Sequence, residues 1–253
     1  MVEKRDNNKP YDCFVAFLDI MGFKDRLNRD GHENVQKLLE SLNAEIENIK
    51  IEAKMILQEQ LTPQKTTETK NTTPTYTIPV SFSDSIILFS SDDSEDSALN
   101  IILDTADIIA KAISKEIPMK GAIAFGKMTT NTNTSLYLGQ PLIDAYELHK
   151  ELKIYGAVLH HSAEKRMGDL GMGNILNSLI ARKYPVPMKS GEIEHHFINW
   201  AFMSVNNVNS IDKLYNTVSG EPRLYIDNTI KYLDWIETQR AKLTQKKANK
   251  ILA

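Results

Sequence analysis

The 253-residue sequence lacks the features that mark several large classes of protein. It has a single cysteine, Cys13, so no disulfide can form within the chain. No apolar run approaches the roughly 20 residues that a membrane-spanning helix needs. The polar start MVEKRDNNKP also lacks the apolar segment of a secretory signal. These absences predict a soluble protein of a reducing compartment, the cytoplasm, without direct membrane insertion.

The chain also lacks a surplus of positive charge. It has 30 Lys and Arg residues against 33 Asp and Glu residues, which gives a formal net charge of -3 at pH 7. Proteins that bind the phosphate backbone of nucleic acids normally carry a basic excess, so we expect no nucleic acid partner. The remaining composition, 42% hydrophobic and 25% charged, is that of a globular protein of one large domain.

The apolar residues change their period along the first half of the chain, and the changes predict six elements. Alternating or continuous apolar runs indicate strands, and steps of three or four residues indicate amphipathic helices. The predicted order is strand, helix, strand, strand, helix, strand, at residues 13–18, 35–56, 75–82, 85–90, 99–113 and 121–126. This order predicts an α+β, ferredoxin-like βαββαβ core, with two helices on one face of an antiparallel sheet. Pro79 lacks the N–H that a sheet needs, so we expect its strand at an edge.

The rest of the sequence shows weaker patterns. Residues 62–74, TPQKTTETKNTTP, and residues 182–192, RKYPVPMKSGE, are predicted loops because both are rich in residues that break regular structure. A short strand and a helix are expected within 136–153, with further strands at 156–160 and 195–202. A long helix is expected over 224–243, in which Ile226, Ile230, Leu233 and Ile236 share one face.

The predicted strand order places two aspartates close together. The third strand of such a sheet lies between the first and the second, so the end of strand one lies beside the hairpin that joins strands two and three. Asp19 occupies the first place and Asp84 the second. Neighbouring strands are about 4.8 Å apart, and two carboxylates so close repel each other unless a proton or a metal intervenes. Their oxygen atoms favour Mg²⁺ or Mn²⁺, although each aspartate alone could simply form a turn or cap a helix.

The sequence MGFK, which follows Asp19 after one residue, adds a feature that suits phosphate. Gly22 allows a close approach of the backbone, and the amides that open the following helix face outward. The amino end of a helix favours a negatively charged group. The pattern therefore indicates a phosphate-binding turn next to the two carboxylates.

These motifs resemble those of the class III nucleotidyl cyclases. FLDIMGFKD at 17–25 is similar to their strand-loop-helix signature, and FSDSI at 82–86 is similar to their hairpin with the second metal-binding aspartate. KGAIAFGK at 120–127 and LYLGQPLIDAYELHKEL at 136–152 resemble the next strand and helix. More narrowly, the combination resembles the pyrimidine nucleotide cyclases of bacterial Pycsar antiphage systems. The resemblance covers about residues 11–160, which leaves 161–253 as a C-terminal extension of one domain spanning 1–253.

The resemblance implies a specific activity and a specific assembly. Members form homodimers and use two Mg²⁺ or Mn²⁺ ions to convert a nucleoside triphosphate to a 3′,5′-cyclic nucleotide and pyrophosphate. Asp19, Asp84 and the backbone carbonyl of Ile20 would hold the metal ions. The nucleotide-binding residues would be Gly22, Phe23, Lys24 and Ser83, the last at a position where the family usually has glycine. The product would be cyclic UMP or cyclic CMP, with UTP favoured as substrate, and it would activate a separate effector protein in antiphage defence.

The sequence departs from the better-known adenylate cyclases at three positions. Ile143 and Glu147 stand where those enzymes have the catalytic Asn and Arg, and Val80 stands near their base-reading Lys. Either the chain is inactive or, as we favour, another cation stabilises the transition state. The nearest candidates are Lys120 as a catalytic residue and Lys127 as a nucleotide-binding residue. Both could instead be solvated lysines at strand ends.

Several alternatives remain open at the level of sequence. The chain could be a catalytically inactive nucleotide-binding or dimerisation module of the same fold, or a purine nucleotide cyclase. An RNA-binding ferredoxin-like domain is disfavoured because the central strands are aliphatic and offer no basic surface. Zinc binding by His160, His161, His195 and His196 is also disfavoured, since adjacent residues of a strand point to opposite faces and no cysteine accompanies them.

Overall fold

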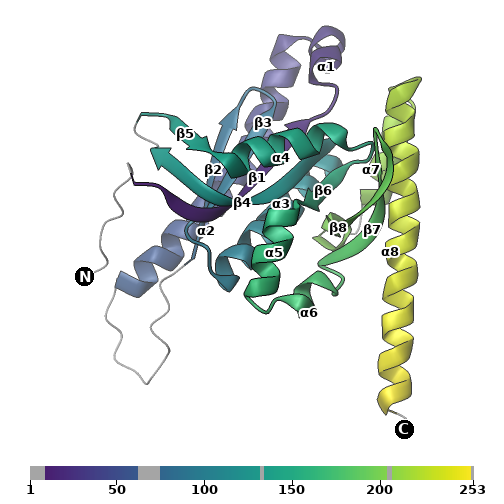
Figure 1. Cartoon of the computed structure of the whole chain (residues 1–253). Helices are drawn as coiled ribbons and strands as arrows, with labels where there is room; N and C mark the ends of the chain where they lie inside the picture. The colour runs from purple at the N-terminus through teal and green to yellow at the C-terminus, as the bar shows by residue number, and fades with distance from the viewer. Residues whose placement is uncertain (1–8, 62–74, 132–133, 204–206, 252–253) are drawn as a thin grey trace.

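The computed structural model describes residues 9–61, 75–131, 134–203 and 207–251. Within these ranges the chain forms one eight-stranded sheet with helices on both faces (Figure 1). The strands are β1 (Tyr11–Ile20), β2 (Thr77–Phe82), β3 (Ser85–Ser90), β4 (Met119–Asn131), β5 (Leu136–Gly139), β6 (Gly156–Leu159), β7 (Ala181–Met188) and β8 (Gly191–Ile198). The helices are α1 (Phe23–Asp30), α2 (His32–Leu61), α3 (Glu95–Ser114), α4 (Gln140–Glu151), α5 (His161–Asp169), α6 (Gly173–Leu176), the 3₁₀ helix η1 (Trp200–Met203), α7 (Asn207–Tyr215) and α8 (Glu221–Ile251).

The first four strands have the predicted order. They lie side by side as β2-β3-β1-β4, and β3 runs antiparallel to both of its neighbours. Strand β2, with Pro79, is at the edge of the sheet, as predicted. The expected ferredoxin-like core is therefore confirmed. Strands β6, β8 and β7 extend the same sheet on the other side of β4.

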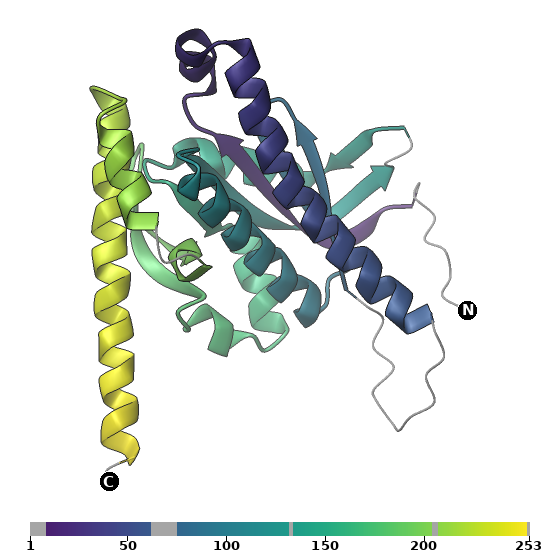
Figure 2. The same cartoon turned by 180° about the vertical axis from the view of Figure 1, so that it is seen from behind.

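The two faces of β1 carry different layers. Figure 2 shows α2 and α3 on one face of the sheet, which confirms the predicted pair of helices, and Figure 1 shows α4 on the other. Phe17 contacts α4 through the rings of Tyr146 and His149, with centroid distances of 5.3 and 4.7 Å. Because side chains alternate along a strand, Asp19 projects to the same side as Phe17, while Leu18 projects toward α3.

The structure corrects two predictions in the second half of the chain. The sequence predicts a loop over residues 182–192, but most of these residues belong to strands β7 and β8. Strand β7 is at the edge of the sheet, so every second backbone nitrogen faces away from β8 and needs no N–H. Pro185 and Pro187 are two residues apart and can both occupy such positions. His160 and His161 do not lie on a strand, since His160 caps α5 and His161 is its first residue. The predicted loop at 62–74 lies outside the described residues.

The C-terminal segment packs against the far end of the sheet. The predicted helix of 224–243 is part of α8, which lies beside β7 (Figure 1). Tyr232 anchors it, because its ring lies 5.1 Å from the ring of Tyr184 on β7 and 4.3 Å from that of Phe197 on β8. Among the described residues, no helix is both long and apolar enough to cross a membrane.

Candidate active site

Asp19 lies at the end of β1, between two other strands. Its register partners are Ser85 on β3 and Lys120 on β4. Directly opposite residues of antiparallel strands project to the same face, so all three side chains point to the side of α4. The fold therefore brings together Asp19 and Lys120, two of the predicted catalytic residues, from positions about 100 residues apart.

Asp84 lies in the tight turn between β2 and β3, next to Asp19. The N–H of Ile20 donates a hydrogen bond of 2.9 Å to the carbonyl oxygen of Asp84, which fixes the end of β1 against this turn. The preceding residue, Ser83, has a φ of 56°. That conformation suits glycine at the first position of a hairpin turn and is uncommon for other residues.

The two carboxylates interact electrostatically. The pKa of Asp19 is raised from 3.8 to about 6, first because the carboxyl group is buried and then because of the negative charge of Asp84. The positive charge of Lys120 opposes this rise. A site in which an ionised carboxylate is this unfavourable gains stability from a bound cation. The donor set, two carboxylates beside backbone oxygens, fits Mg²⁺ or Mn²⁺.

Protein ligands alone would not complete a metal site here. No group of three or more His, Cys, Asp or Glu side chains suited to a metal ion occurs in the described parts of the chain. Mg²⁺ commonly binds to one or two carboxylates and takes its other ligands from water and substrate phosphates. The arrangement of Asp19 and Asp84 fits that mode.

Lys120 supplies a buried positive charge beside the carboxylates. Its residue surface is only 7% exposed, and burial lowers the pKa of its ammonium group. The Nζ atom lies 5.9 Å from the ring centroid of Tyr225, which comes from α8. Lys153 and Lys189 are close enough to affect the same pKa. The C-terminal segment therefore forms part of the surroundings of Lys120.

Lys127 does not reach this site within one chain. It lies on β4 opposite Asp12, at the start of β1, whereas Lys120 lies opposite Asp19 at the end of β1. Seven residues of a strand span about 23 Å. The structure therefore separates the two lysines that the sequence offered as alternatives.

The turn after β1 exposes backbone donors. Gly22 has a φ of 70°, and no side chain caps the amino end of α1 that follows it. The first amides of α1 are therefore available to an anion. Met21 is held in place by a hydrogen bond of 2.8 Å from its N–H to the carbonyl oxygen of Pro118. Phe23 packs against the core, and Lys24 is exposed.

His149 is a site residue that sequence analysis missed. It is 4% exposed, and its Nε2 atom lies 4.0 Å from Oδ2 of Asp19. Burial and the charge of Lys120 lower its pKa to about 4, so the ring is neutral at pH 7. Nδ1 bonds to the carbonyl oxygen of Tyr146 and must donate, which leaves an unprotonated Nε2 facing Asp19. The sequence does contain a signal for His149. Its helical spacing from Leu142 and Ala145 places this polar residue on the inner face of α4.

The outer face of α4 is exposed and partly apolar. Ile143 and Glu147, which sequence analysis compared with the Asn and Arg of the adenylate cyclases, lie on this exposed face. Ile143 is 51% exposed, Tyr146 is 43% exposed, and Leu138 of the adjacent β5 is 64% exposed. This surface is available to another protein chain.

Comparisons with known proteins give limited information. No protein-family model matches the sequence, and no curated protein matches it. Solved structures of similar fold include the catalytic core of a rhodopsin-guanylyl cyclase with converted specificity in complex with ATPαS. It is 12% identical, covers 75% of this chain and 96% of its own, and has a TM-score of 0.48.

Two further structures are similar at the same level. A class III adenylyl cyclase-like ATP-binding protein from Pseudomonas aeruginosa is 15% identical over 63% of this chain and 35% of its own, with a TM-score of 0.44. A bacterial light-regulated adenylyl cyclase is 12% identical over 83% of this chain and 57% of its own, with a TM-score of 0.47. At these scores and identities, the likenesses assign no activity to the chain.

Proposed function

We propose that the chain is a metal-dependent nucleotidyl cyclase. The proposal is carried by one observation, the pairing of Asp19 and Asp84 on adjacent strand ends with Lys120 beside them. In the proposed reaction, the ribose 3′-oxygen bonds to the α-phosphorus as the bond from that phosphorus to its bridging oxygen breaks. The electron pair leaves with pyrophosphate, and the 3′-hydroxyl proton passes to water.

Each of the chain's own groups has a proposed role in this reaction. Asp19 and Asp84, with the carbonyl oxygen of Ile20, would hold two Mg²⁺ or Mn²⁺ ions. When bound, these metal ions supply positive charge that favours an ionised 3′-hydroxyl and neutralises the phosphates. Lys120 would stabilise the negative charge that develops on the α-phosphate. The amides at Gly22 and the next residue would bind the β- and γ-phosphates.

The finer substrate assignment is a pyrimidine nucleotide, with UTP favoured over CTP. It is supported by the resemblance of three motifs and by Val80, which stands near the position of the base-reading Lys of the adenylate cyclases. The cyclic UMP or cyclic CMP product would act on a separate effector protein in antiphage defence. A purine nucleotide cyclase and an inactive nucleotide-binding module of the same fold are the alternatives.

We also propose a homodimer. Leu138, Ile143 and Tyr146 form an exposed apolar surface on the α4 side of the sheet, the side to which Asp19 projects. Exposed apolar patches of this kind mark protein interfaces, and a second copy of the chain would bury them. The class III cyclases that the motifs resemble share their active sites across such an interface.

Incubation with each of ATP, GTP, CTP and UTP, with Mn²⁺ or Mg²⁺, tests these proposals. We expect mass spectrometry to detect cyclic UMP or cyclic CMP with pyrophosphate, from a protein that sediments as a dimer. Asp84→Asn should form no product although its circular dichroism is unchanged. Exclusive conversion of ATP would contradict the pyrimidine assignment. Binding of a nucleotide without release of pyrophosphate would identify the inactive module.

A further inference from the structure

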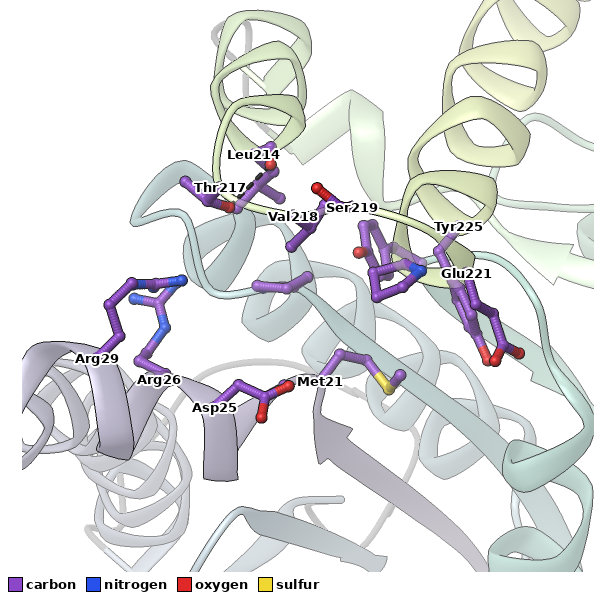
Figure 3. Close-up of a pocket in the computed structure, with 14 residues that line it drawn as sticks. Met21, Asp25, Arg26, Arg29, Leu214, Thr217, Val218, Ser219, Glu221 and Tyr225 are labelled. Carbon is purple, nitrogen blue, oxygen red and sulfur yellow. Dashed lines mark hydrogen bonds between the residues drawn. The ribbon is translucent and has the colours of Figure 1, made fainter.

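A cavity of about 470 Å³ opens beside the candidate active site (Figure 3). It lies between α1 and the connection from α7 to α8, and Met21 and Gly22 of the turn after β1 form part of its wall. Neither Asp19 nor Asp84 lines it. Its volume is in the range of pockets that bind small molecules. The cavity therefore adjoins the carboxylates through the proposed phosphate-binding turn.

Two arginines of α1 face this cavity. Arg26 follows Gly22 by four residues and Arg29 follows Arg26 by three, so the three residues lie along one face of the helix. Figure 3 shows the two guanidinium groups next to each other, across the cavity from the α7–α8 connection. Lys24, which sequence analysis assigned to nucleotide binding, does not line the cavity.

The charge of Arg26 is incompletely compensated. Its Nη2 atom donates to the carbonyl oxygen of Glu116, which uses one of the five N–H donors of the guanidinium group. Burial lowers the pKa of Arg26, so its surroundings disfavour the positive charge. Among the residues that the structure describes, no carboxylate forms an ion pair with it. An anion in the cavity would stabilise this charge.

Acidic residues compensate part of the positive charge of the arginines. The charges of Asp30 and Asp25 raise the pKa of Arg29. Those of Asp30 and Glu116 act in the same direction on Arg26. Glu221, on the opposite wall of the cavity, forms an ion pair with Lys153. Figure 3 shows the carboxylate of Asp25 directed toward Met21, away from both guanidinium groups. Arg29 forms an exposed ion pair with Asp30, which is not part of the lining. Among the described residues, Arg29 uses two of its five N–H donors on Asp30 and Arg26 uses one on Glu116, so both guanidinium groups keep donors for an anion at this end of the cavity.

The geometry points to a diphosphate-binding site, in which Arg26 and Arg29 receive the β- and γ-phosphates of the substrate and then the released pyrophosphate. This inference rests on the proposed function, which supplies the pyrophosphate. Guanidinium groups bind phosphate oxygens in pairs of parallel hydrogen bonds. The α7–α8 connection forms one wall of the cavity, so the C-terminal extension takes part in binding the leaving group.

Calorimetric titration with inorganic pyrophosphate, in EDTA and without nucleotide, tests the site. We expect the wild-type protein to bind pyrophosphate. Arg29→Gln and Ser219→Asp should each weaken the affinity at least about tenfold, since a hydrogen bond to a charged group contributes about 1.5–3 kcal/mol. Ser219 lines the cavity from the α7–α8 connection and has no bond to Arg26, so this variant preserves the contact with Glu116. Asn216→Asp adds the same charge to that connection outside the cavity and should change the affinity less than twofold.

The possible outcomes separate this inference from the proposed function. Absence of pyrophosphate binding, or equal affinity in Arg29→Gln, Ser219→Asp and the wild type, would overturn the inference even if the protein cyclises nucleotides. If the protein cyclises no nucleotide but both variants bind pyrophosphate more weakly than the wild type, only the proposed function is rejected. That result would still support a diphosphate site.

Discussion

Asp19→Asn is expected to reduce cyclic nucleotide formation about 1,000-fold or more and, at the same time, to stabilise the metal-free protein. Activity falls because an amide cannot replace a carboxylate as a ligand of Mg²⁺ or Mn²⁺ and carries no charge. Stability rises because Asn has nearly the same shape as Asp but removes a buried charge and its repulsion from Asp84, which together outweigh the attraction of Lys120. Such opposite effects are typical of a site that evolved for binding and not for stability.

The stability effect of Asp19→Asn has a defined pH dependence. The folded pKa of Asp19, about 6, lies above its ordinary value of 3.8. The unfavourable ionised form is therefore absent below about pH 4 and fully present above about pH 6, so the wild-type protein loses stability as the pH rises through this window. The shift corresponds to about 2 kcal/mol after allowance for the 25% exposure of the side chain. Above pH 6 we expect Tm to rise by about 4–8 °C in the variant.

Thermal melting in EDTA between pH 5 and pH 8 measures this difference. Asp12→Asn is the matched control, because Asp12 is an exposed aspartate at the other end of the same strand. Its melting temperature should follow that of the wild type at every pH. An Asp19→Asn variant that is less stable than the wild type at pH 8 would show that the carboxylates do not destabilise each other.

Lys120→Gln is expected to lower kcat/KM by about 100- to 1,000-fold. Removal of a single positioned group that stabilises developing charge typically has an effect of this size. The variant should also raise the pKa of Asp19 further, because Lys120 is the positive charge that lowers it. Initial rates with the preferred nucleoside triphosphate give the first effect, and thermal melting against pH in EDTA gives the second.

Lys127→Gln is the control for this prediction, since Lys127 lies on the same strand about 23 Å away. We expect its kcat/KM to stay within about threefold of the wild type. Equal losses in the two variants would indicate a general effect of charge on substrate attraction. An unchanged rate in Lys120→Gln would remove Lys120 from the mechanism.

The meeting of Asp19 and Asp84 could be predicted from sequence because it depends on strand order alone. Once the third strand lies between the first and the second, the end of strand one must lie beside the hairpin of Ser83 and Asp84. The apolar periodicity was strong enough to define those strands, and the observed register places Asp19 opposite Ser85.

Other features depend on packing that periodicity does not encode. The histidine beside Asp19, His149, is near it only because α4 crosses the end of β1, and the spacing of apolar residues does not give that crossing. Strand β7 was missed because Pro185 and Pro187 are strand breakers everywhere except at a sheet edge. From sequence, Lys127 was as good a candidate as Lys120. The motif KGAIAFGK does not show that its two lysines lie far apart along one strand.

The cavity at the arginines is a further example. Its walls come from α1 and from the α7–α8 connection, which are about 190 residues apart in the chain. Arg26 follows the phosphate-binding turn by a single helical turn, so its orientation toward that turn could have been inferred. The position of Ser219 across the cavity could not, because it depends on how α8 packs against β7 and β8.

Titration with Mn²⁺ tests most directly whether the two carboxylates form one metal site. We expect calorimetry at pH 7.5 to show Mn²⁺ binding to the wild-type protein, with the affinity weakened at least about tenfold in both Asp19→Asn and Asp84→Asn and unchanged in Asp12→Asn. Equal Mn²⁺ affinity in the wild type and in either of the first two variants would contradict the shared site, and with it the proposed catalytic mechanism.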